Sequence, residues 1–156
     1  MKKKVLFISS TGGHLAEMLK LNAMFKKYDF HIVTEKTKNN MGLKEKYPNR
    51  VSFLIPGSKP LFIYLFKLLG NCFVSLYIYL KIRPKVIITT GAHNAGPMCC
   101  IGKILGSKII YIETLANSES KTKAGRIIYL FADMFIVQWE SMLKLYPKAK
   151  YGGWIY

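Results

Sequence analysis

The sequence predicts an α/β protein built on a Rossmann-like, doubly wound parallel sheet. Short apolar segments alternate with longer segments of helical periodicity, a pattern typical of parallel strands joined by helical crossovers. The expected strands are Val5–Ser9, Phe30–Thr34, Val51–Ile55, Val86–Thr90, Lys108–Glu113 and Met134–Trp139. The expected helices are His14–Lys26, Leu61–Ile82, Ala95–Leu105 and Lys121–Phe131, with a loop or short helix over Lys36–Arg50. In the common strand order 3-2-1-4-5-6, the first and fourth strands are neighbours.

Composition limits the size and chemistry of this domain. The 156 residues are 51% hydrophobic, enough for one packed core but not for two domains. A formal charge of +16 attracts phosphorylated ligands, anionic lipid or nucleic acid, although a bias toward lysine codons would also produce it. No metal site, disulfide framework or cofactor is expected, because the cysteines lack ligand spacing: Cys72, Cys99 and Cys100.

Two loops that contain glycine and histidine follow expected strands. Ser9–His14 leads from the first strand into a helix, and Gly91–Pro97 does so after the fourth strand. This layout aims backbone N–H groups and the positive end of a helix dipole at an anion. Because the two strands are expected to be neighbours, both loops should meet where such sheets bind ligands. The expected phosphate-binding residues are Thr11, Gly12, Gly13, His14, Gly91, His93, Asn94 and Gly96.

Two side chains at this edge are candidates for acid/base catalysis. His14 begins the first helix, and Glu113 ends the fifth strand. An imidazole or a carboxylate can accept the proton of a hydroxyl group, and the sequence does not choose between them. The structural alternatives are a solvated His14 and a Glu113 that stabilises its own loop.

The segment Pro60–Ile82 is long enough to span a bilayer. However, a central Lys67 costs roughly 2.5–3.5 kcal/mol on insertion, and a spanning helix would remove a crossover that the sheet needs. We therefore expect an amphipathic crossover helix whose polar face carries Tyr64, Lys67, Asn71, Ser75 and Tyr79. Its apolar arc is wider than a sheet requires, so either the excess contacts a membrane or the whole arc is core. The expected membrane-contacting residues are Lys59, Phe62, Phe66, Lys81 and Arg83.

The chain ends on bulky apolar residues that are seldom left exposed together. This tail either folds back on the domain formed by residues 1–150 or docks on a partner. The expected partner-docking residues are Tyr151, Gly152, Gly153, Trp154, Ile155 and Tyr156.

Several segments together resemble a known family, over almost the whole chain: Ser10–Leu19, Ile88–Gly106, Lys108–Glu113, Phe131–Trp139, Tyr146–Ala149 and Gly152–Trp154. The sequence is similar to the membrane-anchor subunit of the two-part UDP-GlcNAc transferase of dolichol-linked oligosaccharide synthesis. It resembles still more the bacterial homologues of that subunit, the enhancer subunits of capsule and exopolysaccharide glycosyltransferases. A more distant similarity, to the N-terminal half of the GT-B enzyme that makes lipid II, rests on Gly12, Gly13, His14, Gly91, Gly96, Pro97 and Glu113.

The resemblance implies a peripheral subunit at the cytoplasmic face of the cell membrane. Residues 1–150 would bind the acceptor, a polyprenyl-diphosphate-linked saccharide, and residues 151–156 would dock a separate subunit that binds the UDP-sugar. Activity would require both subunits. On this view His14 and the two loops hold the acceptor diphosphate, while Glu113 contacts the acceptor sugar.

Two other functions fit parts of the sequence. The positive charge permits a nucleic-acid-binding module, but the basic residues are scattered and no known nucleic-acid-binding motif is present, so no nucleic-acid partner is expected. A small dinucleotide-binding enzyme would place an acid such as Glu35 after its second strand. Against this, the first loop lacks the G-x-G-x-x-G spacing of such enzymes.

Overall fold

Seven strands pair in parallel in the computed structural model of the chain, which describes residues 2–57, 61–91 and 93–155. Their order is β3-β2-β1-β4-β5-β6-β7, so the predicted fold class and the order of the six predicted strands are confirmed. The strands are β1 Lys4–Ile8, β2 Asp29–Glu35, β3 Val51–Leu54, β4 Val86–Thr89, β5 Lys108–Ile112, β6 Met134–Val137 and β7 Lys150–Tyr151. The sequence did not predict β7, because two exposed residues leave no periodic pattern.

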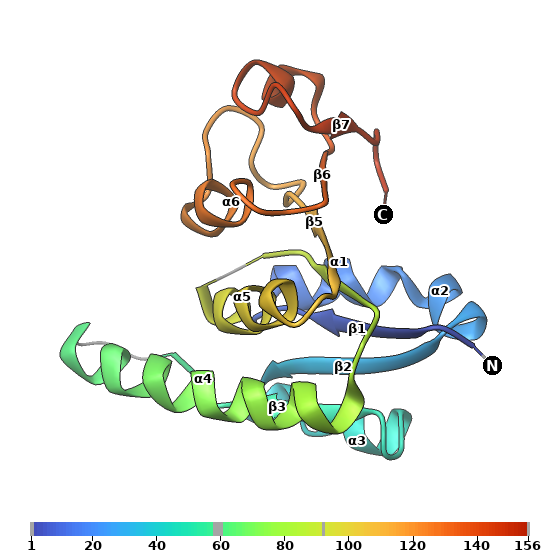
Figure 1. Cartoon of the computed structure of the whole chain (residues 1–156). Coiled ribbons are helices and arrows are strands. Elements are labelled where there is room, and N and C mark those ends of the chain that lie inside the picture. Colours follow the sequence, from blue (N-terminus) through green and yellow to red (C-terminus); the bar gives the residue numbers. More distant parts are fainter. Residues whose placement is uncertain (1, 58–60, 92, 156) are drawn as a thin grey trace.

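Helices cover both faces of the sheet (Figure 1). On one face lie α4, α5 and α6, and on the other lie α1, α2 and α3. The α-helices are α1 Gly13–Lys20, α2 Asn22–Lys27, α3 Leu43–Lys46, α4 Leu61–Ile82, α5 Gly96–Ile104 and α6 Lys123–Ile128. Three short 3-10 helices are η1 Lys38–Asn40, η2 His93–Ala95 and η3 Glu140–Lys144.

The central strand β1 is apolar at consecutive positions because it is covered on both sides. Leu6 and Ile8 pack into the core beneath α4 and α5, whereas Phe7 packs into the core beneath α1 and α2. All three side chains are fully buried. The alternation of side chains along the strand thus supplies both cores from one apolar run.

Two predicted helices differ in their bounds. The expected helix His14–Lys26 is two helices, because the backbone leaves helical geometry at Leu21 between α1 and α2. The helix α6 is shorter than predicted and begins after Thr122, whose side-chain oxygen caps it by accepting from the backbone N–H of Gly125.

The crossover helix α4 turns its polar stripe toward the sheet. Asn71, Ser75 and Tyr79 are buried, with Asn71 only 1% exposed. The Asn71 side chain accepts from the backbone N–H of Ile55 at 2.8 Å and donates to the Ile55 carbonyl at 2.9 Å. The Tyr79 hydroxyl lies 2.9 Å from Ser107 Oγ. These bonds satisfy the buried polar groups of Asn71 and Tyr79, and they anchor the helix to the segment after β3 and to the residue before β5. The buried Ser75 hydroxyl has no hydrogen-bond partner among the described residues.

The opposite face of α4 exposes its apolar side chains. Phe73 is 74% exposed, and it shares this face with Leu65, Phe66, Leu69, Leu76, Tyr77 and Leu80. Among the described residues, one helix is long and apolar enough to cross a membrane, over Leu65–Ile82, and only 22% of that stretch is buried. The expectation that the whole apolar arc is core is therefore wrong. Lys59 and the Phe62 side chain lie outside the described part of the chain.

Candidate functional site

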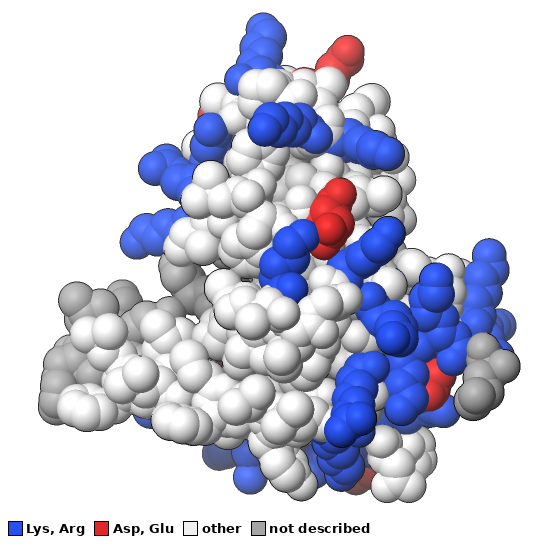
Figure 2. Space-filling view, in the orientation of Figure 1, with Lys and Arg blue, Asp and Glu red and all other residues white. Residues whose placement is uncertain are grey.

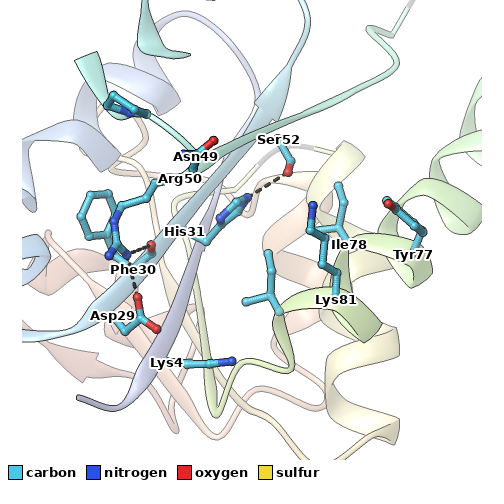
Figure 3. A pocket seen from close by; sticks show the side chains of 12 residues that line it. Lys4, Asp29, Phe30, His31, Asn49, Arg50, Ser52, Tyr77, Ile78 and Lys81 are labelled. Carbon is cyan, nitrogen blue, oxygen red and sulfur yellow. Dashed lines mark hydrogen bonds and ion pairs between the residues drawn. The ribbon is translucent and has the colours of Figure 1, made fainter. Parts of the chain in front are cut away.

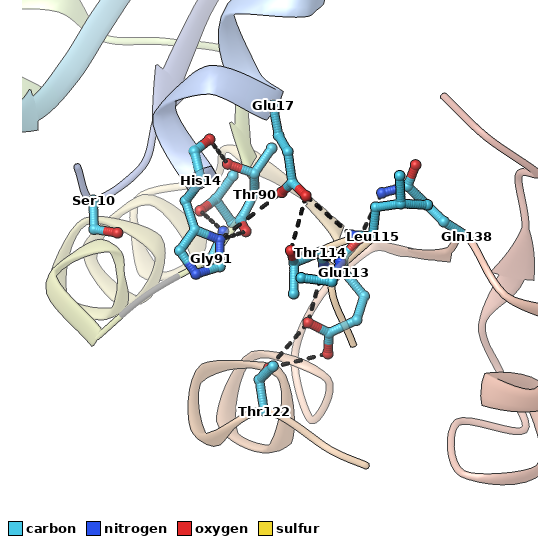
Figure 4. Close-up of polar contacts among 12 residues, drawn as sticks. Ser10, His14, Glu17, Thr90, Gly91, Glu113, Thr114, Leu115, Thr122 and Gln138 are labelled. Atoms are coloured by element: carbon cyan, nitrogen blue, oxygen red, sulfur yellow. Dashed lines mark hydrogen bonds and ion pairs between the residues drawn. The ribbon is translucent and has the colours of Figure 1, made fainter. Parts of the chain in front are cut away.

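The loop after β1 and the loop after β4 meet at the carboxyl edge of the sheet (Figure 4). His14 Nδ1 lies 2.9 Å from the Thr90 carbonyl oxygen, and the Thr90 hydroxyl donates to the His14 carbonyl at 2.8 Å. Because a carbonyl oxygen only accepts, Nδ1 carries the ring proton and Nε2 is left as the acceptor nitrogen. The predicted meeting of the two loops is confirmed, and the bond from Nδ1 to the Thr90 carbonyl oxygen orients the imidazole.

Glycines leave the backbone accessible around His14. Gly12 has a φ of 70°, and no atom lies within 4 Å of an ideal Cβ built at Gly12, Gly13 or Gly96. Gly91 is required for a different reason. It has a φ of 104°, and a Cβ there would lie 2.9 Å from the Tyr111 hydroxyl oxygen. The N-termini of α1 and α5 are therefore open to a ligand at this edge.

Glu17 is a part of this site that the sequence analysis missed. Its Oε1 accepts from the Thr114 hydroxyl at 2.8 Å and from the Leu115 N–H at 3.0 Å, which ties α1 to the loop after β5. Its buried Oε2 has no hydrogen-bond partner among the described residues and lies 4.0 Å from His14 Nδ1. The spacing of three residues on the first turn of a helix was the signal that could have identified this pair.

Glu113, the second predicted acid/base residue, is buried and only 1% exposed. It accepts hydrogen bonds from the hydroxyls of Thr122 at 3.0 Å and Tyr146 at 3.2 Å, and from the Thr114 N–H at 3.1 Å. Gly125 permits this packing, because a Cβ there would lie 2.6 Å from Glu113 Oε2. The Glu113 carboxylate thus joins β5, α6 and the segment after η3, and it points into the domain.

Burial raises the pKa of Glu113 above its ordinary value, and the hydrogen bonds from Thr114, Thr122, Tyr146 and Tyr111 oppose that rise. Burial also raises the pKa of Tyr146, and the neighbouring Glu113 charge adds to the rise. The Tyr146 hydroxyl therefore stays protonated at physiological pH and acts as a donor to the carboxylate.

A pocket of about 390 Å³ lies beside His14. Lys121 and Lys123 bring positive charge to it, and the remaining lining residues are Tyr111, Asn117, Ser120, Thr122 and Ala124. Thr11 lines a neighbouring pocket on the other side of the first loop, together with Gly12, Leu15, Ala16, Leu19, Thr37, Asn39 and Asn40. The described residues contain no group of three or more His, Cys, Asp or Glu side chains that could hold a metal ion.

Asn94, predicted to bind phosphate, is buried and donates its side-chain N–H to the Glu35 carboxylate. This bond ties the second loop to the end of β2. It also engages the carboxylate that a dinucleotide-binding enzyme would direct at a ribose. The side chain of His93 lies outside the described residues.

The predicted docking tail begins in β7 and continues along the carboxyl edge. The Gly152 N–H donates to the Val137 carbonyl at 2.9 Å, and the Ile155 N–H donates to Gln138 Oε1 at 3.1 Å. Trp154 is nevertheless 70% exposed, with its ring centroid 6.0 Å from that of Trp139. The tail backbone is thus tied to this domain while a large aromatic side chain faces outward. Tyr156 lies outside the described residues.

The fold matches part of several larger proteins of known structure. Acinetobacter baumannii MurG superposes with a TM-score of 0.73 at 16% identity, covering 89% of this chain and 42% of that one. The UDP-N-acetylglucosamine 2-epimerase of Rickettsia bellii superposes with a TM-score of 0.74 at 13% identity, covering 98% and 45%. At these identities the likeness establishes the fold alone, and this chain spans less than half of each neighbour.

Sequence relatives define the family more closely. A family profile described as "Oligosaccharide biosynthesis protein Alg14 like" matches residues 58–155. The mouse protein named UDP-N-acetylglucosamine transferase subunit ALG14 is 25% identical over 96% of this chain and 82% of its own length. The Schizosaccharomyces pombe protein of the same name is 30% identical over 97% and 83%. The chain belongs to the Alg14-like family of oligosaccharide biosynthesis proteins.

The buried carboxylate of Glu113 predicts a pH dependence of stability. A carboxyl whose pKa is raised on folding binds its proton more tightly in the folded state than in the unfolded chain. Its contribution to the free energy of unfolding is thus complete below the unfolded pKa and is lost as pH rises through the folded pKa. Glu113→Gln, which is neutral at every pH, should lose less stability than the wild type in urea unfolding as the pH rises above about 4, the ordinary pKa of a glutamate in an unfolded chain. Parallel profiles would contradict this expectation, and the exposed Glu119→Gln controls for the loss of a charge.

Proposed function

We propose that this chain is the acceptor-binding subunit of a heteromeric glycosyltransferase whose sugar donor is bound by a separate subunit. Membership of the Alg14-like family supports this proposal, as does the name of its relatives, UDP-N-acetylglucosamine transferase subunit. The observation that carries it is the junction of the two glycine- and histidine-containing loops at His14 and Thr90. The proposed reaction transfers a sugar from a UDP-sugar to a polyprenyl-diphosphate-linked saccharide.

The acceptor diphosphate would lie across the N-termini of α1 and α5. Open backbone at Gly12, Gly13 and Gly96 supplies N–H groups there, and both helix dipoles present their positive ends. Lys121 and Lys123 add positive charge on the side of His14. Several donors from different elements suit a diphosphate, whose oxygens accept hydrogen bonds in many directions.

His14 is the residue that we propose as the base. In the proposed step, the acceptor hydroxyl gives its proton to His14 Nε2 while its oxygen attacks the anomeric carbon of the donor sugar. The bond from that carbon to the UDP oxygen breaks, and UDP leaves with the electron pair. The Glu17 carboxylate, 4.0 Å away, would stabilise the imidazolium that forms. Glu113, with its carboxylate buried beneath the loop, would act as a positioning residue.

The C-terminal tail is proposed as part of the interface with the donor-binding subunit. Because β7 runs parallel to β6, the residues after it emerge at the same sheet edge as the His14 loop. An exposed aromatic side chain such as Trp154 is typical of the residues that dominate binding energy at protein interfaces. A partner docked there would lie beside the acceptor site, as the transfer of a sugar between two subunits requires.

We further propose that the exposed apolar face of α4 lies on a membrane surface. Further exposed apolar side chains lie at the end of α5, at Ile104 and Leu105, and after α6, at Leu130. Both helices lie on the same side of the sheet as α4. Figure 2 shows this uncharged surface along α4, with basic side chains gathered at its far end. A face of this kind flanked by cations suits peripheral binding to anionic lipid. A spanning orientation is disfavoured because it would pull Asn71 and Tyr79 from their hydrogen bonds with the domain.

Two expectations are more specific than the proposed reaction: the location at the cytoplasmic face of the membrane and the identity of the polysaccharide product. A capsular or exopolysaccharide product is expected from the resemblance of the sequence to bacterial enhancer subunits. The relatives described above are named for transfer of N-acetylglucosamine. Nothing in the comparisons favours a nucleic-acid-binding role.

Reconstitution tests the proposed activity. The full chain co-expressed with its donor-binding subunit should transfer sugar from one of UDP-GlcNAc, UDP-glucose or UDP-galactose to a polyprenyl-diphosphate-linked sugar, and neither subunit alone should do so.

His14→Ala should lower the turnover of the complex by about 10²–10⁴-fold, the usual effect of removing a general base. Lys20→Ala, on the exposed side of the same helix, is the matched control. Efficient transfer by the isolated chain would refute the subunit proposal, and wild-type turnover of the His14 variant would refute its role as a base.

Trp154→Ser tests the proposed subunit interface. Loss of a central aromatic side chain should weaken co-purification with the donor-binding subunit by roughly tenfold or more, equivalent to about 1.4 kcal/mol. Met41→Ser removes an exposed apolar side chain elsewhere on the surface, where Met41 is 46% exposed, and should leave co-purification unchanged. Equal recovery of the partner with both variants would contradict the assignment of the tail to the interface.

The double variant Leu69→Ser, Phe73→Ser tests the membrane-binding face. Because both side chains are exposed, at 58% and 74%, the fold should survive while flotation with anionic liposomes falls severalfold. Met41→Ser is again the control for loss of an exposed apolar side chain. Undiminished flotation of the double variant would show that another surface binds the membrane.

A further inference from the structure

A second pocket opens at the amino edge of the sheet, opposite the loops that carry His14. It has a volume of about 520 Å³, within the range of small-molecule sites. Its walls come from the starts of β1 and β2, the segment that enters β3 and the C-terminal end of α4 (Figure 3). Because it lies at the other ends of the strands, it is separate from the proposed acceptor site.

The pocket carries an excess of positive charge. Lys4, Arg50 and Lys81 line it, against the single carboxylate of Asp29. Asp29 Oδ1 is taken by Arg50 Nη1 at 2.6 Å. In the described part of the chain, no carboxylate lies within ion-pair distance of Lys4 or Lys81. Two ammonium groups therefore remain uncompensated at the mouth of one cavity.

The cationic side chains are supported by fixed polar groups. Arg50 also donates to the Phe30 carbonyl at 2.9 Å and stacks over the Phe30 ring, with its guanidinium carbon 4.9 Å from the ring centroid. These contacts hold the guanidinium plane in place while other N–H groups remain available. His31 Nε2 lies 2.9 Å from Ser52 Oγ, between the strands that form the floor.

The ionisation of His31 responds to burial and to the cations that line the pocket. Burial, followed by the charges of Lys81 and Arg50, lowers the pKa of His31 to about 4, and the opposing charge of Asp29 does not compensate. The ring is therefore neutral at physiological pH. Burial disfavours any charge, but the part of the pKa shift that comes from Lys81 and Arg50 reflects a positive potential, which favours an anion.

We propose that this pocket is a binding site for a phosphate group, carried either by an anionic phospholipid headgroup or by a soluble phosphate monoester. A tetrahedral anion with several oxygens matches donors that line one pocket from different elements: Lys4 from β1, Arg50 from the entry to β3, Ser52 from β3 and Lys81 from α4. A lone carboxylate would use fewer of them.

The position of the pocket is consistent with a lipid as the source. Tyr77 lines the pocket and is 68% exposed, and it belongs to the same apolar face of α4 as Phe73. The pocket thus lies beside the end of the face that is proposed to contact lipid, where a headgroup could reach it. The lipid source rests on the proposed membrane contact of α4. Phosphate binding itself does not, and it does not depend on the proposed transferase activity.

Titration of His31 by NMR in the full chain tests the site without a membrane. Inorganic phosphate or glycerol 3-phosphate should shift the His31 ring resonances saturably and raise the pKa of His31 from about 4, because a bound anion stabilises the protonated ring. Lys81→Gln should weaken this binding by roughly tenfold, the loss of one charge-assisted contact. Lys85→Gln removes an equal charge at the same edge but outside the pocket, and should change the affinity by less than about twofold.

Vesicle binding by the same variants identifies the source. If the ligand is a headgroup, Lys81→Gln should reduce the extra binding that phosphatidylglycerol adds to phosphatidylcholine vesicles well beyond the effect of Lys85→Gln. If it is soluble, the two variants should lose equal vesicle binding while the phosphate titration of His31 remains saturable. The proposal is overturned if phosphate leaves His31 unshifted and the two variants also behave alike on vesicles. Neither measurement uses transferase activity. A negative result would therefore overturn the phosphate-site proposal without bearing on the proposed transferase function.

Discussion

The parallel pairing of β1 with β4 is the constraint on which the rest of this domain depends. It places two chain segments that are about eighty positions apart in sequence at one sheet edge, where His14 and Thr90 exchange reciprocal hydrogen bonds. Parallel pairing also demands a crossover that returns the chain from the carboxyl edge to the amino edge. That crossover is α4. The pairing of β1 with β4 thus brings the two loops together, and it also requires the crossover helix α4, whose outer face is left unpacked.

The helix α4 reverses the usual polarity of a surface helix. Asn71 and Tyr79 satisfy their polar groups against backbone and side chains of the domain, while Phe73 and its neighbours face outward. In water such a face is unfavourable, at about 25 cal/mol for each Å² of apolar surface exposed. A hydrocarbon surface removes that cost, so the polar anchors and the apolar exterior are two aspects of one arrangement. The anchors hold the helix on the domain, and the exterior is free to contact lipid.

The two edges of the sheet divide the chemistry of the molecule. At the carboxyl edge, helix N-termini, His14 and the C-terminal tail face one region, while Glu113 and Glu17 hold the surrounding loops from beneath. At the amino edge, Lys4 and Lys81, which have no ion-pair partner among the described residues, line the same pocket as the neutral His31. Phosphate chemistry suits both edges for different reasons: backbone N–H groups and helix dipoles at one, and side-chain cations at the other.

The sequence by itself determined the fold class and the positions of six strands, because apolar periodicity and glycine-rich turns are local signals. The strand order was taken from the commonest topology of such sheets, and only the tertiary structure established it. The sequence also predicted that the loop carrying His14 meets the loop after the fourth strand, as the structure shows. Only the tertiary structure decided which face of α4 meets the sheet, since the deciding bonds run from Asn71 to the Ile55 backbone. It likewise buried Glu113 beneath Thr122 and Tyr146 and brought Glu17 beside His14. Those outcomes depend on hydrogen-bond partners distant in sequence, and a residue type and its spacing carry no information about such partners until the sheet has assembled.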